Sequence, residues 1–265
     1  MELFATLESL KQLALLVGLS TTRIAVAFLL LPLLSPETVP VMVRNAIFVA
    51  LAALSVALQP QVVVASWGMT QWTGLLLKEA AIGGVLGFGL ASFLWAFEAA
   101  GQIVDTKLSV SNAQVIDPMS GQQVSLSGAL LGRLAGYLFM AGGGFMLFVG
   151  VLIESYAAWP VAQLGWSPPR GAVRLFESHL ASLMSLAFLI AAPALVVMFA
   201  IDLALGLVNR YAPQLNVISI SMSLKAVAST AVWLLMLGVL VQVFDQQFAS
   251  HLGALLPQLR QVLPR

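Results

Sequence analysis

The chain has 265 residues, of which 60% are hydrophobic and only 9% are charged, with a mean hydropathy of +0.98. Soluble domains carry roughly 25% charged residues, so this composition excludes an ordinary soluble domain and indicates a membrane-type protein. A formal net charge of +1 gives no footprint for nucleic acid, and the absence of cysteine excludes disulfides, thiol catalysis and thiolate metal sites.

Apolar runs along the chain predict an all-α integral membrane-type protein with about six long helices in one domain. They cover, in chain order, about residues 13–34, 46–58, 72–100, 128–152, 183–208 and 217–244. A spanning helix needs about 20 apolar residues, so the second run is marginal as a full span. The N-terminus lacks the basic region of a cleaved signal peptide, and the first run is therefore expected to be retained. Cations are nearly balanced between the two faces, so the positive-inside rule does not choose an orientation.

Arg23 stands in the middle of the first run, in the stretch STTRIAVAF. An arginine at the centre of a lipid-facing helix costs about 3 kcal/mol. We therefore expect Arg23 to face protein, water or a carboxylate. A structural ion pair inside the helix bundle is favoured over a functional charge.

Glycines at four-residue spacing mark two of the runs as closely packed helices. Gly83 and Gly87 share one face of the third run, and Gly128, Gly132 and Gly136 form a ladder at the start of the fourth. In membranes, small residues at this spacing allow another backbone to approach. Close helix packing is therefore predicted at both places.

A long polar stretch, residues 101–128, separates the third and fourth runs. It keeps several apolar residues and is not expected to be disordered. A loop this long inside a compact domain is usually functional, and Asp117 and Pro118 begin a turn signature within it. An ordered loop that inserts into a cavity or a partner is favoured over a solvated connector.

A second polar stretch, from Asp202 to Lys225, separates the last two runs and reads DLALGLVNRYAPQLNVISISMSLK. Pro213 lacks an N–H group and biases Ala212 away from the α region. The sequence therefore predicts a helical hairpin that is broken at Ala212-Pro213.

Enzyme chemistry finds no support in the motifs. His179 and His251 are the only histidines and have no partner at metal-ligand spacing, and no serine lies in a G-x-S-x-G motif. We expect no catalytic residue, no metal and no cofactor.

Two classes of membrane protein remain, a secondary transporter and a subunit of a protein-translocating assembly. A transporter would use charges such as Arg23 and Asp202 with a helix broken near Pro193. Its expected paired halves are not evident, because no second copy of the Pro213 break stands in an equivalent place. The translocating assembly is therefore favoured.

The segment AIDLALGLVNRYAPQLNVISISMSLK resembles the most recognisable part of the FliR/SctT family, the single-copy export-gate subunits of flagellar and injectisome type III secretion. Four further stretches are similar in family order: TRIAVAFLLLPLL with VRNAI, KEAAIGGVLGF, GQIVD with IDPMSG, and the GGG-to-IESY region. The resemblance covers nearly the whole chain.

Within that family, Asp105 in GQIVD looks more like the injectisome branch, because flagellar members tend to have an uncharged residue there. The chain departs from the injectisome pattern at residues 106–108, and at Ile218 and Ser223, where Phe and Pro are frequent. The resemblance favours an injectisome SctT-type protein over a flagellar FliR-type protein.

The resemblance implies an R-subunit-like four-helix part in residues 1–180 and an S-subunit-like hairpin with a short tail in residues 181–265. It implies assembly with five R-type (SctR/FliP-like) and four S-type (SctS/FliQ-like) subunits, a SctU/FlhB-type switch protein and inner rod or needle-adaptor subunits. The complex would lie in the basal body at the bacterial inner membrane, raised toward the periplasm, and would conduct exported unfolded proteins.

On this template, residues 101–128 would form a plug-like gating loop in the pore. The loop residues expected to contact the lumen or neighbouring subunits are Asp105, Lys107, Asn112, Gln114, Ile116, Asp117, Pro118 and Met119. The hairpin tip would lie at the cytoplasmic entrance. Its expected subunit contacts are Asp202, Arg210, Pro213, Gln214, Asn216 and Lys225.

Overall fold

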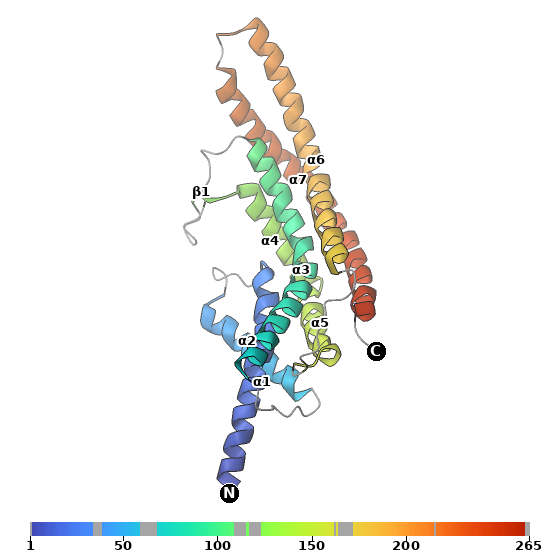
Figure 1. The fold of residues 1–265 in the computed structure, drawn as a ribbon. Coiled ribbons are helices and arrows are strands. Elements are labelled where there is room, and N and C mark those ends of the chain that lie inside the picture. The colour runs from blue at the N-terminus through green and yellow to red at the C-terminus, as the bar shows by residue number, and fades with distance from the viewer. Residues whose placement is uncertain are drawn as a thin grey trace. The chain divides into compact units, whose positions relative to one another are not determined.

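The computed structural model shows a largely helical chain (Figure 1). It divides into two compact units. The described residues are 2–33, 39–58, 68–108, 115–116, 123–161, 163, 172–214 and 216–262. The first unit comprises residues 1–91, 142–176 and 254–265, and the second comprises residues 92–141 and 177–253. These two units are not the predicted R-subunit-like part (residues 1–180) and S-subunit-like hairpin (residues 181–265). That division stays a prediction.

The first unit is helical. Its elements are α1 (Glu2–Leu30), α2 (Val41–Ala57), the first part of α3 (Met69–Lys107) and α5 (Gly144–Ala158). Phe28 of α1 lies at its centre, with ring centroids 5.2 Å from Phe48 of α2 and 4.8 Å from Phe148 of α5. These three rings are buried, so aromatic packing joins α1, α2 and α5.

Glycines of α3 lie directly against the backbone of α1 in the first unit. A Cβ atom at Gly87 would stand 2.7 Å from the carbonyl oxygen of Ala27, and one at Gly83 would overlap the carbonyl oxygen of Arg23. Residue numbers rise together along both helices, so α1 and α3 run in the same direction at this contact. Such a close approach is what the four-residue glycine spacing indicates.

The second unit contains the rest of α3, α4 (Leu126–Ala141), and most of α6 (Ala172–Tyr211) and α7 (Val217–Val262). The rings of Phe93 and Phe97 on α3 lie 5.1 and 5.6 Å from that of Phe244 on α7. Phe248 of α7 extends this aromatic core to Phe139 of α4, with centroids 5.6 Å apart.

A minimal ladder interrupts the helices between α3 and α4. Strand β1 (Val115–Ile116) pairs antiparallel with β2 (Gln123–Val124), and Val115 lies opposite Val124.

The structure confirms an all-α, membrane-type architecture, and each of the six apolar runs is helical. Among the described residues, four helices are long and apolar enough to cross a membrane, or up to five if α4 and α5 form one broken span. The predicted count of about six long apolar helices is therefore approximate. α2 has only 17 residues, and the fourth run breaks at Gly143, whose φ of 75° suits glycine.

Candidate functional site

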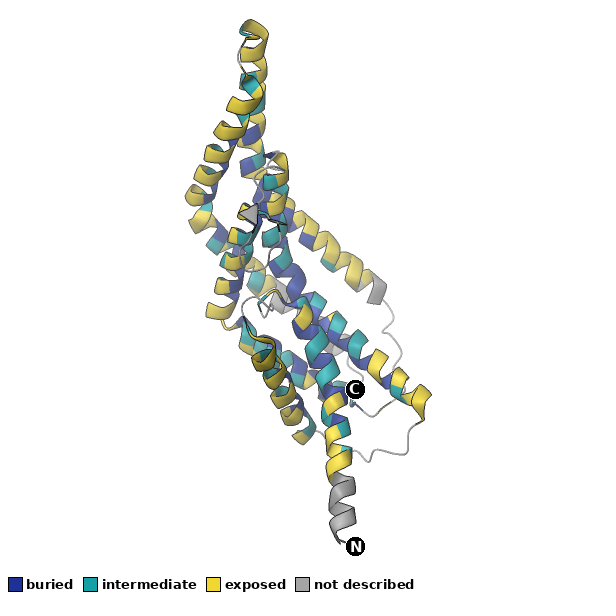
Figure 2. Cartoon of the chain, turned by 90° about the vertical axis from the view of Figure 1, so that its left-hand side faces the viewer, coloured by how far each residue is buried: buried dark blue, intermediate teal, exposed yellow. Residues whose placement is uncertain are grey.

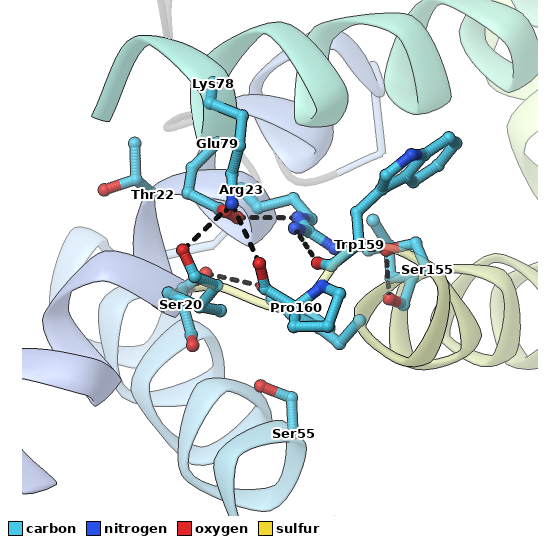
Figure 3. A network of polar contacts seen from close by, with 12 residues as sticks. Ser20, Thr22, Arg23, Ser55, Lys78, Glu79, Ser155, Trp159 and Pro160 are labelled. Carbon is cyan, nitrogen blue, oxygen red and sulfur yellow. Dashed lines mark hydrogen bonds and ion pairs between the residues drawn. The ribbon is translucent and has the colours of Figure 1, made fainter. Parts of the chain in front are cut away.

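Arg23 is the centre of a buried polar cluster in the first unit (Figure 3). Its Nε donates a hydrogen bond to Glu79 Oε2 at 2.7 Å, and both side chains are 0% exposed. Nη1 donates to Ser155 Oγ at 2.9 Å, and Nη2 donates to the carbonyl oxygen of Trp159 at 2.8 Å. The guanidinium carbon lies 4.0 Å from the ring centroid of Tyr156. Every face of the cation is thus in contact with protein.

Lys78 of α3 holds the segment that follows α5. Its Nζ donates to the carbonyl oxygens of Pro160, Val161 and Gln163 at 2.9, 2.9 and 3.0 Å, and lies 3.0 Å from Glu79 Oε1. Carbonyl groups at and beyond a helix C-terminus lack intrahelical partners and carry partial negative charge. Lys78 supplies donors and positive charge to these groups.

Tyr156 ties α5 to α1 in the same cluster. Its hydroxyl donates to the carbonyl oxygen of Ser20 at 2.6 Å, and Ser155 Oγ donates to the carbonyl oxygen of Leu152 at 2.6 Å. Arg23 and Glu79 have no exposed surface, so no solute can reach them without a rearrangement of the helices. The arrangement therefore suits a structural lock between α1, α3 and α5 rather than a substrate site.

The sequence did not single out Lys78, Glu79, Ser155 or Tyr156 as site residues. One feature of the sequence could have indicated Glu79. Glu79, Gly83 and Gly87 follow one another at four-residue spacing, so the glycine face of α3 continues to Glu79 one turn earlier. The residue that would pair with a buried arginine on α1 was therefore present on the packing face of α3.

Asp105 fastens the end of α3 to the start of α4 in the second unit. Its Oδ2 accepts hydrogen bonds from Ser125 Oγ at 2.6 Å and from the backbone N–H of Ser127 at 2.8 Å. Ser125 Oγ in turn accepts from the N–H of Gly128 at 3.0 Å. Two orphan donors at the N-terminus of α4 are satisfied in this way, and the carboxylate lies at the positive end of the helix.

The predicted boundary of the polar stretch is corrected, because α3 continues to Lys107 instead of ending near residue 100. Ala100, Val104 and Leu108 are buried at four-residue spacing, and this apolar stripe keeps the last turns of the helix packed. Asp105 and Lys107 thus lie on a helix and not in the loop. Ile116 lies in β1. The other expected loop residues, Asn112, Gln114, Asp117, Pro118 and Met119, lie outside the described residues.

The glycine ladder of α4 faces α3. A Cβ at Gly128 would lie 2.9 Å from Gln102 Cγ, and one at Gly132 would lie 3.4 Å from Glu98 Cβ. Gly136 is buried. Gly101 of α3, which the sequence did not single out, lies against the backbone at the start of α4.

The α6–α7 turn lies where the sequence predicted it. α6 ends at Tyr211, directly before Ala212-Pro213, and α7 begins at Val217. Asn216 Oδ1 accepts from the N–H of Ser219 at 3.4 Å. The expected contact residues Arg210, Pro213, Gln214 and Asn216 are exposed.

Asp202 and Lys225 were both expected to contact other subunits. In the structure they form an ion pair between α6 and α7. Lys225 is the more buried partner, with 11% of its side chain exposed against 35% for Asp202. Their charges are therefore used within the hairpin.

Replacing Asp105 with alanine is expected to loosen the first turn of α4, because a lost cap costs about 1 kcal/mol. That cost corresponds to roughly a fivefold rise in local opening. Hydrogen exchange at the amides of residues 127 and 128 measures it, with Asp105→Asn expected to lie between the two. Asp245→Ala removes an exposed carboxylate of the same unit and should leave these amides unchanged. Equal exchange in Asp105→Ala would contradict the capping role.

The observations define a class, namely multi-pass helical membrane-type proteins in which buried charges join helices. Among the described residues, no group of three or more His, Cys, Asp or Glu side chains could hold a metal ion. The charged groups of Arg23, Asp105 and Lys225 are engaged in contacts between helices or at helix ends.

Residues 14–251 match the family described as Bacterial export proteins, family 1, and the chain belongs to this family. It is 31% identical over 233 residues to Yop proteins translocation protein T of Yersinia pestis, covering 86% of this chain and 85% of the relative. It is 31% identical over 222 residues to Surface presentation of antigens protein SpaR of Salmonella typhimurium, covering 82% and 81%. It is 28% identical over 231 residues to Flagellar biosynthetic protein FliR of Bacillus subtilis, covering 86% and 88%.

These matches confirm the FliR/SctT resemblance. The two relatives named for translocation and antigen presentation are more similar to the chain than the flagellar relative is. The injectisome branch is favoured accordingly.

Proposed function

We propose that this chain is the single-copy SctT-type subunit of an injectisome export gate and forms the protein-conducting entry portal with R- and S-type subunits. The observation that carries the proposal is the family match over residues 14–251, with relatives named for translocation and for flagellar biosynthesis. The proposed place is the bacterial inner membrane, within the basal body.

The proposed partners rest on the resemblance to FliR/SctT proteins, and membership of the export-protein family supports them. They are the R-type and S-type subunits, the SctU/FlhB-type switch protein, inner rod or needle-adaptor subunits, and the unfolded proteins in transit. The long exposed apolar stretches of α6 and α7 support burial of this hairpin in lipid or against other subunits (Figure 2).

The segment between α3 and α4 is proposed as the gating plug. Its two ends are held together, because Asp105 at the end of α3 binds Ser125 and Ser127 at the start of α4. The β1–β2 ladder adds a second tie further along the segment. A segment with a fixed base can enter a narrow lumen with a small buried area, and a small area allows reopening.

Deleting residues 116–120 is expected to raise ion leakage through the assembled complex, because it shortens the proposed plug and removes Ile116 from the β1–β2 ladder, while the bonds from Asp105 to Ser125 and Ser127 remain. Conductance of the purified complex in planar bilayers measures the leak. A length-matched variant with Gly-Ser residues in the same five positions separates loss of the side chains from loss of length. Co-purification with the R- and S-type subunits controls for assembly, and an assembled complex with unchanged leakage would overturn the plug assignment.

A further inference from the structure

One face of α4 is unpartnered. Leu126, Leu130, Tyr137 and Met140 are 60%, 53%, 71% and 50% exposed, and Arg133 between them is exposed as well. The five positions are separated by four, three, four and three residues, so they form a single stripe along the helix. We refer to this stripe as the α4 face.

The other side of α4 is already used in the second unit. Its buried residues are Gly128, Leu131, Ala135, Gly136 and Phe139. Glycines on that side meet Gln102 and Glu98 of α3. α4 therefore packs against α3 on one side, and the α4 face on its other side remains exposed.

Neither water nor lipid suits the α4 face. Water would leave four large apolar side chains of one contiguous stripe exposed. Lipid would face an arginine with no counter-charge, which is costly in hydrocarbon. A surface that combines an apolar stripe with one central cation is best covered by protein that carries a matching anion.

Among the described residues, the three buried cations of the apolar helices, Arg23, Lys78 and Lys225, each lie beside a carboxylate. Arg23 is paired with Glu79, and Lys225 is paired with Asp202. Among the described residues, no carboxylate lies within ion-pair distance of Arg133. The described part of the chain supplies no counter-charge to Arg133, which leaves a place for a carboxylate from a partner.

We infer that the α4 face is a subunit interface that binds an apolar helix of another export-apparatus subunit, with a carboxylate of that helix opposite Arg133. The alternating three- and four-residue spacing is that of a helix–helix seam. From Leu126 to Met140 the seam spans about 21 Å, which about 14 residues of a partner helix can cover. The inference rests on the proposed function, because it takes the partner from the same assembly.

A photo-crosslinking amino acid at Tyr137 tests this interface in the full chain, co-expressed with the R- and S-type subunits. The expected result is an adduct to one apolar helix of a subunit other than this chain, with an Asp or Glu within about one turn of the crosslinked residue. An adduct to a second copy of the chain, to lipid alone, or to a helix without a nearby carboxylate would overturn the inference.

Charge variants test the ion pair. Arg133→Leu is expected to reduce the recovery of assembled complex at least tenfold, while Arg133→Lys retains most of it. Replacing the partner carboxylate by leucine together with Arg133→Leu should restore recovery. Arg174→Leu, which removes another exposed arginine, is the matched control and should assemble normally.

The same experiment separates the two levels of the proposal. If the unaltered chain assembles and Arg133→Leu assembles equally well, the interface is wrong and the proposed function stands. If the unaltered chain does not assemble with these subunits, both are overturned. Recovery of the variant chain expressed alone, which should equal that of the unaltered chain, shows that the loss arises at assembly and not at folding.

Discussion

Replacing Glu79 with alanine is expected to destabilise the first unit by about 3–5 kcal/mol, because it leaves Arg23 buried without its counter-charge. Arg23 and Glu79 are both 0% exposed and lie 2.7 Å apart, so neither water nor a side-chain movement on the surface can replace the lost carboxylate. Typical domains are stable by only about 5–15 kcal/mol, so the variant should lose a large part of its stability. Thermal unfolding of the purified chain in detergent measures the effect.

Two further variants separate charge from shape at Glu79. Glu79→Gln keeps a hydrogen-bond acceptor near Arg23 Nε and should be intermediate. The double variant Arg23→Met with Glu79→Met removes both charges, and should recover part of the stability that either single change loses. Glu177→Ala, at an exposed carboxylate of α6, should leave the midpoint unchanged. A midpoint for Glu79→Ala equal to that of the unaltered chain would contradict the lock.

The requirement for a buried partner to Arg23 could be predicted from the sequence, and the identity of that partner could not. The cost of an unpaired arginine in an apolar run depends only on local composition. Which carboxylate pairs with Arg23 depends on which helices pack together, and Glu79 is 56 residues away along the chain. Lys78 illustrates the same limit, because its three acceptors are backbone carbonyl groups beyond α5, which no side-chain pattern reveals.

Helix ends show a second limit of prediction. The break at Ala212-Pro213 follows from proline's missing N–H group, which is a local property, and α6 ends there. The end of α3 was placed too early because residues 101–107 are polar on average. Their helical state depends on tertiary packing of Val104 and on the bonds from Asp105 to the start of α4, and neither is visible in composition.

Counting spans shows the third limit. All six apolar runs form helices. Among the described helices, however, only four are long and apolar enough to cross a membrane, or five if α4 and α5 form one broken span. Apolar runs report burial, and burial inside protein gives the same pattern as burial in lipid. The count of runs was therefore an upper bound on the number of spans.

Replacing Gly83 with alanine is expected to separate α1 from α3, because the added Cβ would overlap the carbonyl oxygen of Arg23. The obstacle is backbone, which cannot move aside as a flexible side chain can, so the two helices have to shift. Glu79 lies one turn before Gly83 on the same face of α3. A shift of α1 away from α3 therefore lengthens the hydrogen bond between Arg23 and Glu79. We expect a loss of about 2–4 kcal/mol, combining overpacking with a weakened buried pair.

The adjacent glycine provides the matched control for this prediction. A Cβ at Gly84 would meet only Val26 Cγ1 at 4.0 Å, so Gly84→Ala adds a methyl group at ordinary contact distance. Alanine is also the better helix former by about 1 kcal/mol, so Gly84→Ala should be neutral or stabilising. Opposite signs of the change in unfolding midpoint for two neighbouring Gly→Ala substitutions would show that the effect at Gly83 comes from the approach of α1. Equal effects at Gly83 and Gly84 would mean that helix propensity alone explains both. The close contact between α1 and α3 would then not be needed to hold the polar cluster around Arg23.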